Sequence, residues 1–297
     1  MDEARAVGDL ATSQKKDTIS IHNFFMFLAA AKRDDAELRR QVAWAAGKPA
    51  EYGMTARLGV YQDTFGHIKE SRETAKQALS LAQKFGFNEA PAIVASVRAY
   101  RDAFHGFSES ARQTAAESVR LTDERAVHSF AAVAFAQAGD TAQAEKIINE
   151  LDKTYPADTI IKYGFSPAVR ALLLLQHNQA AQAIAELEPV RKYDLAFSLG
   201  ANNPSFLLLH VRGLAYLQAK DGLKAAGEFQ KILDHNGLNT VSVFLPLAQL
   251  GVARAYALQG DTAKAKTAYQ DFFAVWKDAD PDIPALIAAK SEYAKLK

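Results

Sequence analysis

The chain contains no cysteine, and this absence excludes several classes of protein. Without thiols there is no disulfide framework, no iron–sulfur cluster, no thiolate zinc site and no cysteine nucleophile. Cytosolic and periplasmic proteins both do without cysteine, so the compartment stays open. Glycine, with 16 residues, and proline, with 9, are also sparse in a chain of 297 residues. Together with abundant alanine, this composition favours helix.

The chain also has no marked excess of positive or negative charge and no long apolar run. Lys and Arg number 35 against 34 Asp and Glu, whereas binding to nucleic acid requires a basic face. The longest apolar stretch, Phe24 to Ala31, is far shorter than the roughly 20 residues of a membrane span. The polar start at residues 1–5 does not match a signal peptide. We therefore expect a soluble chain, cytoplasmic or periplasmic, with no nucleic-acid partner and no membrane insertion of its own.

Sequence motifs that carry chemistry are absent as well. The chain has no His-Glu-x-x-His, no Gly-x-Ser-x-Gly, no phosphate-binding glycine loop and no kinase catalytic loop. Its 7 histidines are scattered, and no two lie four residues apart. Neighbouring carboxylates such as Asp34-Asp35 lie in turns and at helix starts, where capping explains them. The sequence thus predicts no catalytic residue, no cofactor and no metal site, and hence not an enzyme.

One sequence motif, in contrast, occurs twice in closely similar form: Ala-Gly-Asp-Thr-Ala-Gln-Ala at 138–144 and Gln-Gly-Asp-Thr-Ala-Lys-Ala at 259–265. Glycine can end one helix in the left-handed conformation, and the following aspartate can cap the next helix. Small, aromatic and large apolar residues complete the first copy, at Ala132, Phe135, Ala144, Ile148, Leu151 and Pro156. This spacing resembles the tetratricopeptide repeat, a helix–turn–helix unit of about 34 residues.

The same spacing recurs with drift along the chain. Further helix pairs are predicted to break at Lys220-Asp221, Asn178, Gly106, Gly66 and Asp34-Asp35. A final helix from Asp282 to Leu296 would cover the last apolar face, as a solenoid requires. The predicted fold is all-α, an α-solenoid of six to seven antiparallel helix pairs in a right-handed superhelix. It forms one domain over 1–297, with degenerate helices at 1–50, repeats at 51–277 and a capping helix at 282–297.

An exposed stripe on the first helix of each pair is expected to line the concave face, where tetratricopeptide arrays bind extended peptides. This stripe is mainly apolar with sparse polar groups. It suits an apolar peptide, a partner helix or a neighbouring segment of the chain itself. The predicted binding residues are Ser96, Tyr100, Phe104, Gln137, Gln176, His210, Gln218 and Arg254.

An arginine precedes the small close-packing residue in three pairs, in Val97-Arg98-Ala99, Val169-Arg170-Ala171 and Val211-Arg212-Gly213. Two interpretations stay open for these arginines. They could line a binding groove, or their stems could pack while their heads pair with an acidic neighbour in the adjacent helix.

Longer sequence segments resemble a more specific family than the tetratricopeptide repeat in general. They are Ala-Trp-Ala-Ala-Gly-Lys-Pro at 43–49, Glu-Phe-Gln-Lys-Ile-Leu-Asp-His at 228–235, and the stretch 269–284. With Gly-Asp-Thr-Ala-Lys-Ala at 260–265, they resemble the C-terminal repeat region of bacterial eukaryotic-like serine/threonine kinases. In that family the repeat region follows a kinase domain and a membrane span, and serves sensing or docking; some relatives carry a winged-helix domain instead of the kinase. The resemblance implies a docking role, and a periplasmic side if a span precedes the chain. It implies no activity, because the kinase motifs are missing.

Two hypotheses follow for the function. The leading one is a non-catalytic scaffold that binds a peptide or protein partner in the concave groove, as the sensing or docking module of a signalling kinase. The alternative is a structural repeat protein that associates with itself as an oligomer or filament, because an open-ended solenoid needs only one weak cap for end-to-end association.

Overall fold

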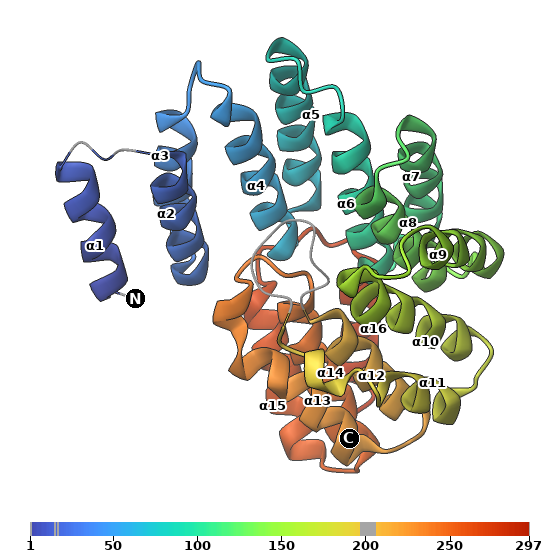
Figure 1. Cartoon of the computed structure of the whole chain (residues 1–297). Helices are drawn as coiled ribbons and strands as arrows, with labels where there is room; N and C mark the ends of the chain where they lie inside the picture. Colours follow the sequence, from blue (N-terminus) through green and yellow to red (C-terminus); the bar gives the residue numbers. More distant parts are fainter. Residues whose placement is uncertain (1, 15, 17, 197–205, 297) are drawn as a thin grey trace. The chain divides into compact units, whose positions relative to one another are not determined.

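The computed structural model describes residues 2–14, 16, 18–196 and 206–296 of the chain (Figure 1). Within these ranges every regular element is a helix and none is a strand. The prediction of an all-α array of antiparallel helix pairs is confirmed. The chain divides into two compact units, unit 1 at residues 1–90 and unit 2 at residues 91–297, and each is described by itself. One continuous domain and the hand of a superhelix stay predictions.

Unit 1 holds two helix pairs preceded by a single helix. The helix pair predicted to break at Asp34-Asp35 is present: Arg33 adopts the left-handed conformation, with φ 55°, and the Asp34 side chain accepts a hydrogen bond of 2.9 Å from the amide of Glu37. The next pair breaks at Gly66, which has φ 82°. The helices of unit 1 are α1 (Asp2–Ser13), α2 (Ile19–Lys32), α3 (Asp35–Trp44), α4 (Ala50–Thr64) and α5 (Ile68–Lys84).

Helix α1 lies in the region predicted to hold degenerate helices at 1–50, but the sequence did not predict its bounds. It packs on α2 where Gly8 lies against the Phe25 ring and leaves no room for a side chain. Its Arg5 pairs with the buried Glu37 of α3 at 2.7 Å and lies over the Phe25 ring. A lone helix has no second copy and no break residue, so repeat spacing cannot reveal it.

Unit 2 continues with further pairs and ends in a single helix. Each predicted break adopts the left-handed conformation, at Gly106, Gly139, Asn178, Lys220 and Gly260. The helices are α6 (Ala90–His105), α7 (Ser108–Leu121), α8 (Arg125–Gln137), α9 (Thr141–Thr154), α10 (Ser166–Gln176), α11 (Ala180–Leu187), α12 (Leu207–Gln218), α13 (Gly222–Asp234), α14 (Phe244–Leu258), α15 (Thr262–Val275) and α16 (Pro284–Ala294). Shorter turns are the π-helix η1 (Ile161–Phe165) and the 3-10 helices η2 (Arg191–Tyr193) and η3 (Asn236–Leu238). Proline favours the first turn of a helix, so Pro204 also predicts a helix start, and this position lies outside the described residues.

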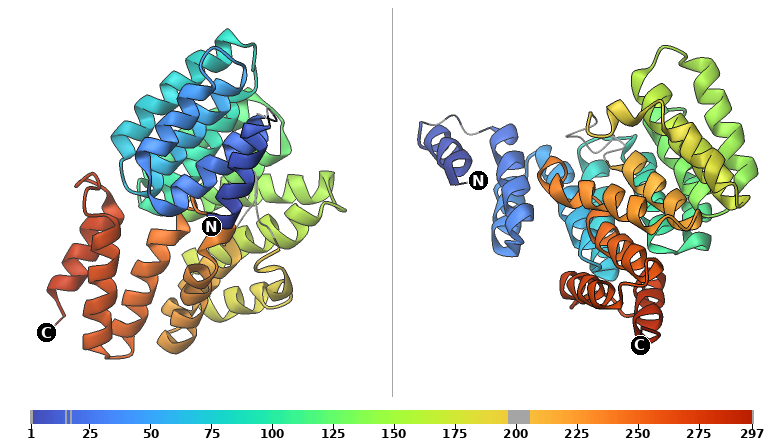
Figure 2. Two further views of the ribbon diagram at one scale, coloured as in Figure 1. Left: turned by 90° about the vertical axis from the view of Figure 1, so that its left-hand side faces the viewer. Right: turned by 90° about the horizontal axis from the view of Figure 1, so that it is seen from below.

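Small residues let the helices of unit 2 approach closely. Ala132, Ala144, Ala225 and Ala265 are fully buried, as the repeat spacing predicted. The α12–α13 and α14–α15 pairs lie side by side, with α13 packed against α14 (Figure 2). Aspartates at the breaks cap the second helices, because Asp140, Asp221 and Asp261 each accept a hydrogen bond from the amide three residues on.

The first helix of unit 2 also contacts the last ones. The Phe104 ring of α6 lies edge-on to the Phe244 ring of α14, with centroids 4.8 Å apart, and the His105 ring lies 5.5 Å from that of Trp276. A side chain at Gly106 would approach Pro284 of α16 to 2.9 Å. The helix array of unit 2 therefore returns on itself, and α6 packs on the faces of α12 and α14.

Candidate interaction surfaces

Four of the residues predicted to bind a peptide lie in the core of unit 2. Ser96, Tyr100, Phe104 and His210 are only 1%, 7%, 6% and 5% exposed. The His210 ring stacks on Phe244 at 4.5 Å and meets the edge of Phe104 at 5.4 Å. We name Tyr100, Phe104, Phe130, His210 and Phe244 the inner aromatic cluster. In this arrangement a peptide reaches these residues only if α6 moves away, and their role in binding stays a prediction.

Burial also fixes the charge of the inner aromatic cluster. The pKa of His210 is lowered to about 3, first by burial and then by the positive charge of Arg254. Its Nδ1 is buried without a hydrogen-bond partner among the described residues. Burial raises the pKa of Tyr100. Both side chains are therefore neutral at physiological pH, as packing in an apolar core requires.

Two of the three predicted glutamines, Gln176 and Gln218, connect successive first helices through their side chains, whereas Gln137 contributes its backbone carbonyl. Gln176 of α10 donates its side-chain amide to the Ala136 carbonyl of α8 at 3.1 Å and to the Gln137 carbonyl at 3.4 Å. Gln218 of α12 donates in the same way to the Leu175 carbonyl of α10 at 3.0 Å. The last carbonyls of a helix have no partner within it, so these amides satisfy acceptors that the repeats leave open.

Arg254 holds the last helix of unit 2. Its Nε and Nη2 each donate to the Glu292 carboxylate of α16 at 2.9 Å, and the Tyr269 hydroxyl donates to the same carboxylate at 2.7 Å. Burial acts to raise the pKa of Glu292, but the hydrogen bond and charge of Arg254 outweigh it and lower that pKa. Helix α16 buries Leu286 and Ala289 and takes the place predicted for a capping helix.

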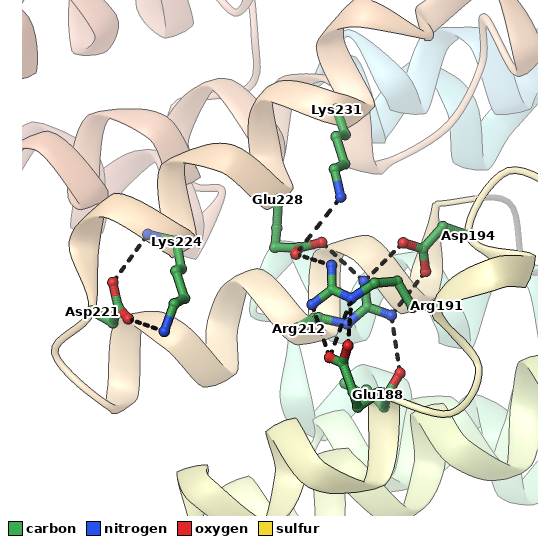
Figure 3. A network of polar contacts seen from close by, with 9 residues as sticks. Glu188, Arg191, Asp194, Arg212, Asp221, Lys224, Glu228 and Lys231 are labelled. Atoms are coloured by element: carbon green, nitrogen blue, oxygen red, sulfur yellow. Dashed lines mark hydrogen bonds and ion pairs between the residues drawn. The ribbon is translucent and has the colours of Figure 1, made fainter.

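Arg212 lies at the centre of an ionic network that is buried at Asp194 and Glu228 and reaches the surface at Glu188 (Figure 3). Its side chain is fully buried; Nη1 donates to Asp194 and to Glu228, both at 2.9 Å, and Nη2 donates to Asp194 at 2.8 Å. Arg191 binds Glu228 at 2.7 Å and Glu188 at 3.0 Å. Burial works to lower the pKa of Arg212, but Asp194 and Glu228 outweigh it and raise the pKa. We name Glu188, Arg191, Asp194, Arg212 and Glu228 the arginine network.

The pairing interpretation therefore describes Arg170 and Arg212, but not Arg98. Arg170 binds Asp152 of α9 at 2.6 Å, in the adjacent helix, whereas Arg98 lies 3.6 Å from Asp102 in its own helix. The repeat spacing indicated Arg212 but not its partners. An acidic residue on an amphipathic helix follows the same sequence pattern whether it faces solvent or a buried arginine.

An open groove lies between α13, α14 and α15, with a volume of about 500 Å³. Within the described part of the chain Asp271 forms no ion pair, whereas Lys264 is paired with Asp261 at 2.9 Å. The Gln249 Oε1 is buried and has no hydrogen-bond partner in the described ranges. The groove is lined by Gln230, Leu233, Gln249, Val252, Tyr256, Ala263, Lys264, Thr267, Ala268 and Asp271. None of these residues is among those predicted from the sequence to bind a peptide.

The described residues contain no group of three or more His, Asp or Glu side chains placed to hold a metal ion. None of the described helices is long and apolar enough to cross a membrane.

Comparisons with known proteins do not assign the chain to a family. No family model matches the chain, and no curated protein matches it. Among solved structures, the chain is similar to a tetratricopeptide repeat protein from Parabacteroides merdae, with a TM-score of 0.49 and 12% identity over 92% of this chain and 97% of that one. It is also similar to yeast Tom70, with a TM-score of 0.47 and 12% identity over 99% of this chain and 58% of that one. Likenesses this distant assign no family, so the fold description rests on the helices themselves.

Proposed function

We propose that the chain is a non-catalytic scaffold that binds a peptide or protein partner. The observation that carries this proposal is the groove on α13, α14 and α15, an open surface within a repeating array of helix pairs. Helical repeats present such surfaces on rigid elements, and partners bind them through grooves between helices. The sequence resemblance to kinase-associated repeats supports a finer proposal, a docking or sensing role beside a signalling kinase.

Site-specific photo-crosslinking on the full chain tests the scaffold proposal. A crosslinking amino acid replaces one residue at a time, at Leu233 or Thr267, which line the groove, or at Leu121 of α7, which is 52% exposed and does not line it. We expect one discrete partner to be captured from some of these positions and not from others, and to bind the purified chain directly. Equal capture from every position, or none from any, would contradict a scaffold with a defined binding face.

Self-association is favoured by a separate observation. The first helix of unit 1 and the last helix of unit 2 both expose large apolar side chains, Val7 at 69%, Leu10 at 57% and Ile287 at 53%. Sedimentation of the full chain across concentrations decides this alternative. Self-association is supported if the sedimenting mass rises with concentration in the wild type and not in an Ile287→Lys variant. It is rejected if the wild type stays a monomer at every concentration.

A further inference from the structure

The groove on α13, α14 and α15 occupies the same place in its repeat as the arginine network does in the preceding one. Helices α12 and α13 align with α14 and α15 at an offset of 40 residues, which matches Tyr216 with Tyr256 and Asp221 with Asp261. Helix α11 aligns with α13 at an offset of 42, which matches Leu187 with Phe229, both fully buried. Positions in the two repeats can therefore be compared one by one.

Four members of the arginine network have counterparts that line the groove. Each charged side chain is replaced by a residue that forms no ion pair. The pairs are Arg212 and Val252, Glu228 and Ala268, Arg191 and Leu233, and Glu188 and Gln230. The preceding repeat thus fills this space with a guanidinium and its carboxylates (Figure 3), whereas the next repeat leaves it open as a groove of about 500 Å³.

The chemistry of the groove favours a cationic side chain with an apolar stem. Val252, Leu233 and Ala268 offer apolar surface for such a stem. The counterpart of Lys231 is Asp271, so this position carries the opposite charge in the groove. Asp271 is exposed and pairs with no cation in the described ranges, while Lys264 is neutralised by Asp261. The uncompensated charge of the groove is therefore negative.

Arginine fits this description better than lysine does. Its planar guanidinium can bind a carboxylate through two parallel hydrogen bonds, and its weaker hydration makes partial burial less costly. The buried Gln249 Oε1, which lacks a partner among the described residues, can accept a further N–H from the guanidinium or from a peptide bond. We propose that the groove on α13, α14 and α15 binds an extended peptide segment through an arginine side chain of that segment. This inference deepens the scaffold proposal and rests on it.

A titration of the full chain with two blocked pentapeptides tests the inference. Both carry alanine around a central residue, which is arginine in one and its uncharged isostere citrulline in the other. Amide NMR signals of α13, α14 and α15 should shift with the arginine peptide. Citrulline should bind up to about fivefold more weakly, since an ion pair with an exposed carboxylate contributes up to about 1 kcal/mol. Asp271→Asn should remove this preference and leave the citrulline peptide unaffected.

A second variant fills the groove with residues that the chain already uses. Val252→Arg combined with Ala268→Glu places the Arg212–Glu228 pair in the following repeat, and should abolish binding of the arginine peptide while the other amide signals stay in place. If that pair does not fold, Gln249→Leu, which introduces the counterpart residue Leu209, serves instead and should weaken binding. Three results would each overturn the inference. The two peptides could bind with equal affinity, the amide signals could shift on other helices only, or the arginine peptide could bind the filled variant as tightly as the wild type.

The same filled variant separates this inference from the scaffold proposal. If a partner captured by crosslinking binds the filled variant as tightly as the wild type, the arginine groove is wrong and the scaffold proposal stands. If the full chain captures no partner at all, the scaffold proposal fails, and the peptide titration still decides whether the groove prefers arginine.

Discussion

The ring of Phe229 shows how single residues set the spacing of the helices in unit 2. A Cβ atom at Gly213 of α12, or at Gly251 of α14, would lie 2.6 Å from this ring. That distance is far below van der Waals contact, so glycine at both positions allows α12 and α14 to close on the aromatic residue of α13. The conformation of neither glycine matters here; what matters is the missing methyl group.

Alanine at either position should therefore destabilise unit 2. We expect Gly213→Ala and Gly251→Ala each to cost about 1–3 kcal/mol of unfolding free energy, as overpacking of a core does. Urea denaturation measures this loss. Gly227→Ala on α13 is the matched control, since no atom beyond its chain neighbours and the local backbone of its own helix lies within 4 Å of the place that its new Cβ atom would occupy, and it should gain about 0.5–1 kcal/mol from helix propensity. If all three variants behaved alike, close packing at Phe229 would not explain the two glycines.

Protonation of His210 is the residue-scale source of a pH dependence. Its pKa in the folded chain is about 3, against an ordinary 6.5, so the unfolded chain binds the proton more readily than the folded one. The stability that neutral His210 provides is fully present above about pH 6.5 and is lost as the pH falls from there towards 3. By linkage the loss between pH 7 and pH 5 is roughly 2 kcal/mol.

The His210→Leu variant isolates this effect, because it removes the titrating group and keeps an apolar side chain. Its unfolding free energy should fall less than that of the wild type between pH 7 and pH 5. Carboxylates whose folded pKa is lowered, such as Glu292, act mainly below their ordinary 4.5 and so contribute little in this window. If the unfolding free energies of the two proteins fell by the same amount between pH 7 and pH 5, protonation of His210 would not destabilise the folded chain.

At the scale of elements, the sequence was most informative where a break recurs. Gly139 and Gly260 end their helices with φ 84° and 76°, and the aspartate after each caps the next helix. These are local requirements of the backbone, so one residue type at one position suffices to predict them. Helix α1 has no such copy, and the wide turn η1 before α10 has no residue signal that the repeat spacing could detect.

The binding stripe could not be predicted in the same way. Repeat spacing identifies the face of Tyr100 and His210 but not what covers it, and contacts of α6 with α12 and α14 depend on how the array of unit 2 curves back. The groove on α13, α14 and α15 could not be predicted because its residues carry no distinctive sequence pattern. Val252 and Ala268 are ordinary helix residues in the sequence, and they become informative only beside Arg212 and Glu228, their counterparts one repeat earlier.

Helix α16 offers a prediction at the element scale. Its attachment combines apolar packing with the Arg254–Glu292–Tyr269 contacts, and the charged pair is about one-third exposed on each side. Glu292→Gln keeps the shape and removes the charge, so we expect a cost of about 1 kcal/mol or less, confined to α16. Hydrogen exchange of the α16 amides should become faster while that of α12 stays unchanged. Equal changes in both helices would mean that α16 opens only with the rest of unit 2.

At the scale of the whole molecule, the division into two compact units can be measured with the two tryptophans of the chain. Trp44 belongs to unit 1, where its ring stacks on His22 at 3.5 Å. Trp276 belongs to unit 2, where it is 2% exposed and packs on Phe272. In Trp44→Phe the fluorescence therefore reports unfolding of unit 2, and in Trp276→Phe that of unit 1.

Arg212→Met provides a perturbation restricted to unit 2. It removes one partner from a buried ionic network and leaves the carboxylates of Asp194 and Glu228 poorly compensated, a change that typically costs about 3–5 kcal/mol. In the Trp44→Phe background the denaturant midpoint of Trp276 should fall accordingly. In the Trp276→Phe background the midpoint of Trp44 should stay where it was, because unit 1 has its own core around Met26, Leu38 and Met54. If the Trp44 transition moved by the same amount, the two units would unfold as one cooperative body, and the continuous array expected from the repeats would describe the energetics better than the division does.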